Sequence, residues 1–204
     1  HPVVDRLEKM IASGELGKIH YIYTQRVNLG VIRQDENALL SFAPHDLSVI
    51  LHLLREKPAV VSAHGESYIQ DGIEDVVFLS LHFSERKMAN IHLSWLDPHK
   101  VRKITIVGSK KMVVFDDMET SEKLKIYDKG VGSPSYDTYA EYLSLRFGDI
   151  TIPNIRMVEP LRTEAEHFIR CIESREKPKT GAGDGLDVVK ILIAAQQSLK
   201  QKGF

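Results

Sequence analysis

The sequence predicts an α+β fold whose central part is a mostly antiparallel β-sheet. Between residues 58 and 128, apolar and polar residues alternate in a series of short segments, as they do in half-buried strands. Short polar turns at residues 84–87 and 108–111 separate neighbouring segments, which is typical of hairpins between antiparallel strands. Segments with helical spacing lie before and after this region rather than between its strands. A parallel sheet built from βαβ units is therefore excluded.

Four segments place apolar residues three and four positions apart, the spacing of one helix face. The predicted helices are residues 2–13, 39–55, 160–174 and 184–201. Pro2 and Pro160 stand where the first and third helices begin, a position that tolerates a residue without an N–H group. Gly14 ends the first helix, and Asp184 is predicted to cap the fourth.

The strands follow from alternation and from the turns that bound them. The predicted strands are residues 17–28, 58–69, 74–84, 87–96, 101–108, 111–116 and 123–128. The loop 29–38 connects the first strand to the second helix. Residues 129–158 are predicted to be irregular, because glycines and prolines interrupt them repeatedly. Connections of this length are usually functional or mobile.

One face of the predicted sheet is polar but carries few charges. Its residues in two neighbouring strands are Ser80, His82, Asn90, His92 and Ser94. A face in free contact with water normally carries lysine and glutamate, so these uncharged residues favour partial burial at a subunit interface. The alternative interpretation is an ordinary wet sheet face. We expect a homodimer or homotetramer formed through this face.

The composition fits a single globular domain over residues 1–204. There are 27 basic and 28 acidic residues, a net charge of −1, and no block of like charges, which argues against nucleic acid or a membrane surface as partner. Apolar runs are too short for a membrane span. The single cysteine, Cys171, rules out an internal disulfide framework and favours a cytoplasmic protein.

Two further patterns indicate what the chain lacks. The glycine-rich segment 180–189 follows a turn rather than a strand and has Leu186 at the last fingerprint position, so it does not predict a dinucleotide site. The nine histidines show no clustered spacing, so no metal is predicted. Because the chain opens at His1 inside an amphipathic helix, we expect it to be the carboxy-terminal part of a longer protein.

The triplet Pro44-His45-Asp46 is the most unusual feature of the second predicted helix. We expect Pro44 to mark the true start of the helix, which places His45 and Asp46 in its first turn. Asp46 is favourable there, whereas the positive end of the helix dipole lowers the pKa of His45. A neutral imidazole in this position can accept a proton from a hydroxyl group. The alternative is that His45 only packs or caps.

The chain resembles the carboxy-terminal domain of the Gfo/Idh/MocA oxidoreductases. The resemblance rests on "HPVVDRLEKMIASGELGKIHYIYTQRVNLG", "APHDLSVILHLL", "SWLDPHKVRKITIVGSKKMVVFDD" and the closing "EAEHFIRCIESREKPKTGAGDGLDVVKILIAAQQSL". It implies a large open sheet of the glyceraldehyde-3-phosphate-dehydrogenase-like type, with helices on one face and oligomer contacts on the other. It also implies that NAD or NADP is bound by an amino-terminal Rossmann domain that this chain does not contain. The version with P-H-D-[LI] and S-W-L-x-P-x-K resembles members that oxidise UDP-N-acetylated hexosamines to ketones.

The resemblance also implies site residues. The family's helix motif is D-x-x-x-H-x-x-D, and His45 matches its histidine, which implies a catalytic or substrate-binding role; we expect the catalytic one. Ser41 and Ser48 replace the two aspartates, so an aspartate role cannot be transferred. The predicted substrate-binding residues are Arg26, Asn28, Arg33, Asn37, Ser41, Asp46, Trp95 and Lys100. Arg33 is the expected ligand of a nucleotide phosphate, because a guanidinium binds phosphate with two hydrogen bonds.

Two other functions stay open. A non-catalytic sugar-binding or assembly module could use the same fold, and the replacement of aspartate by Ser41 leaves room for it. A metal-dependent hydrolase is weakened by the scattered histidines.

Overall fold

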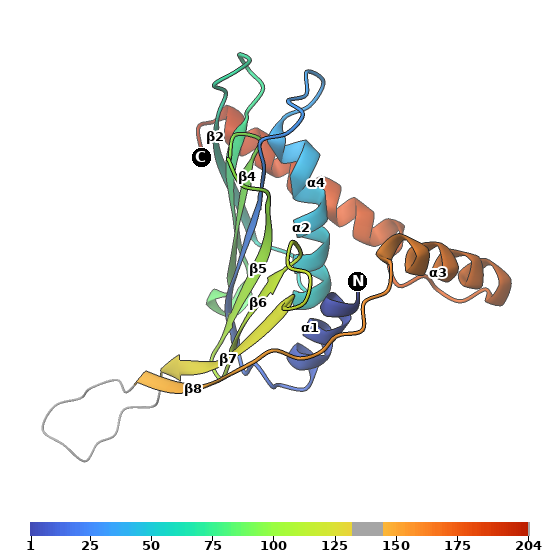
Figure 1. The fold of residues 1–204 in the computed structure, drawn as a ribbon. Helices are drawn as coiled ribbons and strands as arrows, with labels where there is room; N and C mark the ends of the chain where they lie inside the picture. The colour runs from blue at the N-terminus through green and yellow to red at the C-terminus, as the bar shows by residue number, and fades with distance from the viewer. Residues whose placement is uncertain (132–144, 204) are drawn as a thin grey trace, which may run out of the picture.

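The computed structural model describes residues 1–131 and 145–203, which form one eight-stranded sheet and four α-helices (Figure 1). The elements in chain order are α1 (Pro2–Ala12), β1 (Ile19–Val27), α2 (Ala38–Leu54), β2 (Val60–Glu66), β3 (Val76–His82), the short 3₁₀ helix η1 (Ser84–Arg86), β4 (Met88–Ser94), β5 (Val101–Gly108), β6 (Met112–Asp116), β7 (Leu124–Val131), β8 (Leu145–Thr151), α3 (Pro160–Ser174) and α4 (Ala182–Lys200). The α+β prediction is confirmed.

The sheet has the strand order β2-β3-β4-β1-β5-β6-β7-β8. Every neighbouring pair is antiparallel except β1 and β4. A tight turn cannot connect two parallel neighbours, so parallel strands need a long connection along the chain. Here α2, β2 and β3 form that connection between β1 and β4. The sheet is thus mostly antiparallel, as the hairpin signals predicted.

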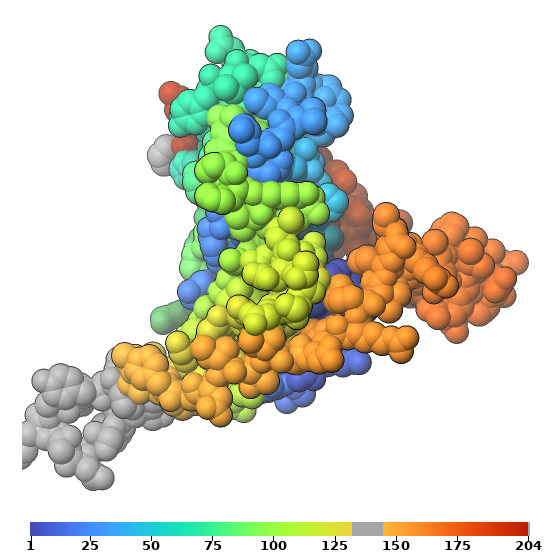
Figure 2. All heavy atoms as spheres, in the orientation of Figure 1, coloured from blue at the N-terminus to red at the C-terminus, as the bar shows by residue number. Residues whose placement is uncertain are grey.

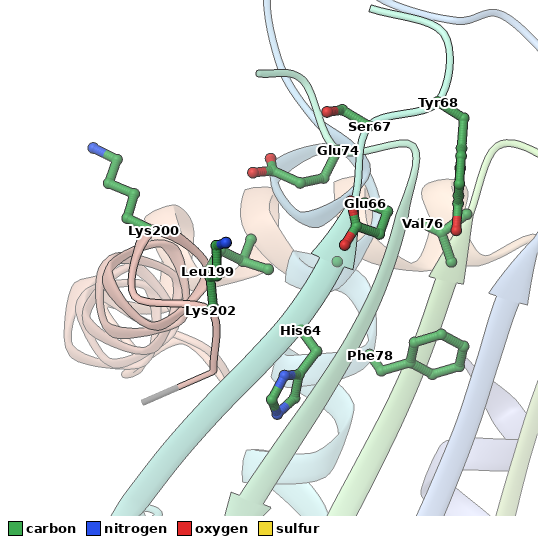
Figure 3. Close-up of a pocket in the computed structure, with 11 residues that line it drawn as sticks. His64, Glu66, Ser67, Tyr68, Glu74, Val76, Phe78, Leu199, Lys200 and Lys202 are labelled. Carbon is green, nitrogen blue, oxygen red and sulfur yellow. The ribbon is translucent and has the colours of Figure 1, made fainter. Parts of the chain in front are cut away.

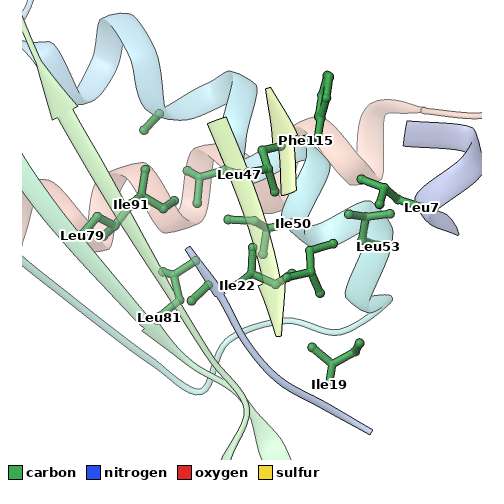
Figure 4. Packing of buried hydrophobic residues seen from close by; sticks show 14 of the residues in the cluster. Leu7, Ile19, Ile22, Leu47, Ile50, Leu53, Leu79, Leu81, Ile91 and Phe115 are labelled. Carbon is green, nitrogen blue, oxygen red and sulfur yellow. The ribbon is translucent and has the colours of Figure 1, made fainter. Parts of the chain in front are cut away.

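Helices α1, α2 and α4 cover one face of the sheet (Figure 1). Apolar side chains of α2 meet those of β1 and β4 in the core, where Leu47, Ile50, Ile22 and Ile91 are at most 1% exposed (Figure 4). Removal of this apolar surface from water is the main stabilising contribution. The packing also fixes the position of α2, which carries the Pro-His-Asp triplet.

Helix α4 protects the exposed edge of the sheet. The buried hydroxyl of Ser198 accepts a hydrogen bond from the Ala63 N–H at 2.9 Å and donates to the Ala63 carbonyl at 3.4 Å. These groups lie on the side of β2 that has no neighbouring strand. An uncovered edge would offer a template for pairing with another chain, and α4 removes it.

The prediction for residues 129–158 was partly wrong. Strand β7 continues to Val131, and Leu145–Thr151 forms β8, which pairs with it. All residues of β8 are exposed, so the strand has no buried face and its sequence lacks the alternation that reveals a strand. Backbone pairing with β7 therefore holds this strand. The remainder of the predicted loop falls partly on residues 132–144, outside the described residues.

Helix α3 stands away from the body of the molecule (Figures 1 and 2). It is amphipathic in sequence, yet none of its residues is buried. Leu161, Phe168, Ile169 and Ile172 are between 54% and 72% exposed. An apolar helix face of this size in water is unfavourable and indicates a contact surface.

Candidate functional site

His45 lies two turns inside α2 rather than at its start. The helix begins at Ala38, and the side chain of its N-cap, Asn37, accepts a hydrogen bond from the Leu40 N–H at 3.1 Å. The prediction that Pro44 starts the helix was therefore wrong. Asn37 is a strong cap, and burial of the apolar face of α2 offsets the roughly 3 kcal/mol that an internal proline costs.

A buried ion pair lies directly beside His45. The Nε group of Arg26 on β1 donates to Oδ2 of Asp46 at 2.8 Å, and Nη2 donates to Oδ1 at 3.2 Å. The Asp46 side chain is 2% exposed and that of Arg26 is 18% exposed. The structure thus places two predicted substrate ligands against each other, and neither caps the helix. The pair joins α2 to the centre of the sheet.

A second arginine lies opposite Arg26, and the sequence analysis missed it. Arg102 on β5 is the cross-strand partner of Arg26, and its side chain is exposed. It shares the helix-covered face with the buried residues Ile104 and Ile106. The sequence did carry a signal: Arg102 continues the alternation of Ile104 and Ile106 and so places a charge on the apolar face of the predicted strand.

Burial and these nearby charges together shift the pKa of His45. Its pKa is lowered from 6.5, first because the ring is partly buried, and then because Arg26 and Arg102 repel a second positive charge. Asp46 opposes this effect and raises the pKa. The predicted direction was right, but its cause was wrong: burial and arginines replace the helix dipole. The imidazole is neutral at pH 7 and can accept a proton.

The loop before α2 uses its polar residues internally. The Nε and Nη2 groups of Arg33 each donate to a carboxylate oxygen of Asp35 at 3.1 Å, and Nε also lies 2.8 Å from a carboxylate oxygen of Glu36. The amide of Asn37 donates to Glu74 at 2.6 Å. Arg33 is thus already neutralised by two carboxylates, which is unfavourable for the phosphate contact that the sequence predicted.

The other predicted ligands lie at different depths. The Asn28 N–H donates to the Ser94 carbonyl at 3.1 Å at the end of β1. Ser41 is half-buried and stands one turn before His45 on the same side of α2. Trp95 is 1% exposed and therefore belongs to the interior. Lys100 is exposed immediately before β5.

Two cavities border α4. One, of about 460 Å³, lies where β2, β3 and the end of α4 meet, and its lining includes His64, Tyr68 and Phe78 (Figure 3). The other, of about 640 Å³, lies between α2 and the start of α4. His45 lines neither cavity, although Ser48, one turn further along α2, lines the second, and the His45 side chain is exposed.

Residues 1–131 and 145–203 hold no cluster of histidine, cysteine and carboxylate side chains suited to a metal ion. Among the same residues, no helix combines the length and apolar character needed to cross a bilayer.

Comparison with protein families decides the classification. Residues 4–114 match the GFO/IDH/MocA C-terminal domain. The chain belongs to the Gfo/Idh/MocA family. It is therefore a domain of an oxidoreductase family, as the sequence motifs implied. No curated protein matches the chain.

Solved structures share the fold of this Gfo/Idh/MocA domain. UDP-N-acetylglucosamine 3-dehydrogenase GnnA from Acidithiobacillus ferrooxidans superposes with a TM-score of 0.79 at 19% identity, over 99% of this chain and 60% of that one. Aldose-aldose oxidoreductase from Caulobacter crescentus gives 0.78 at 16% identity, over 98% and 60%. An NAD-binding protein from Listeria innocua gives 0.74 at 14% identity, over 96% and 61%. The chain spans about three fifths of the length of these proteins, and such identities show the fold alone.

Proposed function

We propose that this chain is the substrate-binding half of a nicotinamide-dependent dehydrogenase that oxidises a hydroxyl group of a nucleotide sugar, of the UDP-N-acetylhexosamine class, to a ketone. The observation that carries the proposal is the position of His45 on α2, where it matches the family histidine and lies next to the Arg26–Asp46 ion pair. Similarity to a UDP-N-acetylglucosamine 3-dehydrogenase and to an aldose oxidoreductase supports the substrate class.

In this proposal His45 acts as the general base. Its imidazole accepts the proton of the sugar hydroxyl as the carbon becomes a ketone. Partial burial, and then the two arginines, lower the pKa of His45 and so favour the neutral ring before the reaction. The ion pair between Arg26 and Asp46 holds the helix that presents the ring. A nicotinamide, bound elsewhere, supplies the hydride acceptor.

The glycine-rich start of α4 does not fit a dinucleotide. The glycine-rich start of α4 is the place where a pyrophosphate would bind, but the Gly181 N–H already donates to the Asp184 carboxylate at 2.7 Å. Asp184 is the third residue of the helix and caps it through a capping box, as the sequence predicted. We therefore place the NAD or NADP site in a separate domain.

Two surfaces support such a domain. The His45 site is open, and α3 exposes an apolar face that nothing in the described structure covers. In this proposal, the domain that binds the nicotinamide closes the His45 site and covers the apolar face of α3.

The proposal predicts an activity of the full-length protein. UDP-N-acetylglucosamine with NAD or NADP should yield reduced nicotinamide, measured by its absorbance, and the present chain alone should yield none. The proposal fails if the full-length protein binds UDP-N-acetylhexosamines but reduces neither nicotinamide with any of them. That result would favour the non-catalytic sugar-binding module, which Ser41 and Ser48 in place of the family aspartates leave open.

We also propose that the uncovered sheet face forms the subunit interface. Its aromatic side chains Tyr21, Tyr23 and Phe78 are 37% to 53% exposed. Its polar residues contact other residues of the same face. The Ser80 hydroxyl donates to the Asn90 side-chain oxygen at 2.8 Å, and the Phe78 and His92 rings stack with their centroids 4.4 Å apart. Such a mixture of aromatic and internally satisfied polar groups is typical of an interface core.

Tyr23→Glu should convert the oligomer to a monomer in sedimentation, because it buries a charge at the centre of that face. Met118→Glu is the matched control, since Met118 is 43% exposed but lies in the turn after β6. A wild-type monomer, or an oligomer that survives Tyr23→Glu, would contradict the interface.

A further inference from the structure

The charges around His45 do not balance. Arg26 and Arg102 lie directly opposite each other on β1 and β5, on the face that α2 covers. Like charges at directly opposed positions of a sheet destabilise it unless a counter-charge is present. Asp46 is the carboxylate at this position, and Arg26 occupies both of its oxygens. The cluster therefore keeps one positive charge.

The two arginines differ in exposure and in partners. Arg26 is mostly buried and is held by two hydrogen bonds to Asp46. Arg102 is exposed, and within residues 1–131 and 145–203 its guanidinium has no carboxylate within ion-pair distance and no hydrogen-bond acceptor. Asp117, whose N–H donates to the Arg102 carbonyl, directs its carboxylate to Lys123 and His1 instead. Arg102 thus keeps its donors available for a ligand.

We propose that Arg102 is the specificity-determining residue of the His45 site and binds an anionic oxygen of the substrate, a phosphate or a carboxylate. This inference rests on the proposed function and adds a division of roles between two neighbouring guanidinium groups. Arg26 positions the helix through Asp46, and Arg102 selects substrates by charge. A guanidinium offers two parallel donors to such an anion, which also orients it.

The kinetic test compares charged and uncharged sugars in the full-length enzyme. Arg102→Met should raise KM for UDP-N-acetylglucosamine by about 10- to 100-fold, the loss expected for a hydrogen bond to a charged group, while kcat changes much less. KM for uncharged N-acetylglucosamine should stay unchanged, and Arg102→Lys should restore part of the loss. Arg86→Met is the matched control, because Arg86 lies in the turn before β4, at the end of that strand away from the partner of Arg26. Equal KM values in the wild type and Arg102→Met with the charged sugar would overturn the assignment.

A second measurement does not depend on turnover. The groups that face His45 are Arg26 from β1, Asp46 from α2 and Arg102 from β5, so an anion bound at Arg102 should raise the pKa of His45. NMR titration of the His45 ring in the full-length protein should show this rise with inorganic pyrophosphate in the wild type and in Arg86→Met, but not in Arg102→Met. Acetate, in a parallel titration, distinguishes a carboxylate site from a phosphate site. If the rise occurs but no sugar is oxidised, the proposed reaction fails and the anion site stands. If neither anion raises the pKa, the anion site fails, whatever the protein oxidises.

Discussion

Replacing His45 with alanine in the full-length enzyme is expected to lower kcat by about 10²- to 10⁴-fold, the usual contribution of a general base. The ring is neutral because partial burial and two arginines lower its pKa, so it is available to accept the hydroxyl proton. KM should change less, because proton transfer contributes to the transition state rather than to ground-state binding. Steady-state kinetics with the sugar as variable substrate measure both constants.

His45→Asn separates proton transfer from positioning, because the amide keeps a hydrogen bond but has no basicity. It should be nearly as inactive as His45→Ala. His52→Ala is the matched control: His52 lies two turns further along α2 and faces Glu8 at 3.3 Å instead of the two arginines. Retention of most activity by His45→Asn would show that His45 positions the sugar and that another group is the base.

Replacing Asp46 with alanine is expected to reduce the free energy of unfolding by about 3–5 kcal/mol, the cost of leaving a buried charge without its partner. The side chain of Arg26, which is 18% exposed beside Asp46, would then lie opposite a second arginine without its carboxylate partner. Urea unfolding followed by circular dichroism measures the change.

Two further variants isolate the ion pair as the cause. The double variant Arg26→Met/Asp46→Leu should recover most of the loss, since it leaves no unpaired charge. Asp187→Ala is the surface control: it removes the exposed pair with Lys57 at 2.8 Å and should cost at most about 1 kcal/mol. If Asp46→Ala costs no more than Asp187→Ala, the pair does not hold α2 to the sheet.

The sheet could be predicted from the sequence where burial imposes alternation. In β5, Ile104 and Ile106 are buried and Lys103 and Thr105 are not, and the predicted bounds 101–108 are those of the strand. Strand β8 escaped prediction because both of its faces are exposed. Helix α2 was predicted from its apolar face to within one residue at each end, but Pro44 was wrongly expected to mark its true start, because the asparagine cap before the helix was overlooked.

The site could be predicted only in part. His45 was found because it combines a poor helix former with a family motif. Its neighbours Arg26 and Arg102 come from β1 and β5 and are 19 and 57 positions away along the chain. Strand register decides that Arg26 meets Arg102, and helix packing decides that Asp46 lies between the helix and the sheet. Neither property is local in the sequence, so the ion pair between these two predicted ligands could not be foreseen.

The dependence of kcat/KM on pH tests most directly whether His45 is the base in this site. The lowered pKa of His45 places its titration below pH 6.5, and protonation there removes the lone pair that accepts the substrate proton. For the wild-type full-length enzyme, kcat/KM should therefore be constant at neutral pH and fall as the pH drops below 6.5, and the residual activity of His45→Asn should lack this decline. The same decline in His45→Asn as in the wild type would assign the titrating base to another residue and contradict the catalytic role of His45.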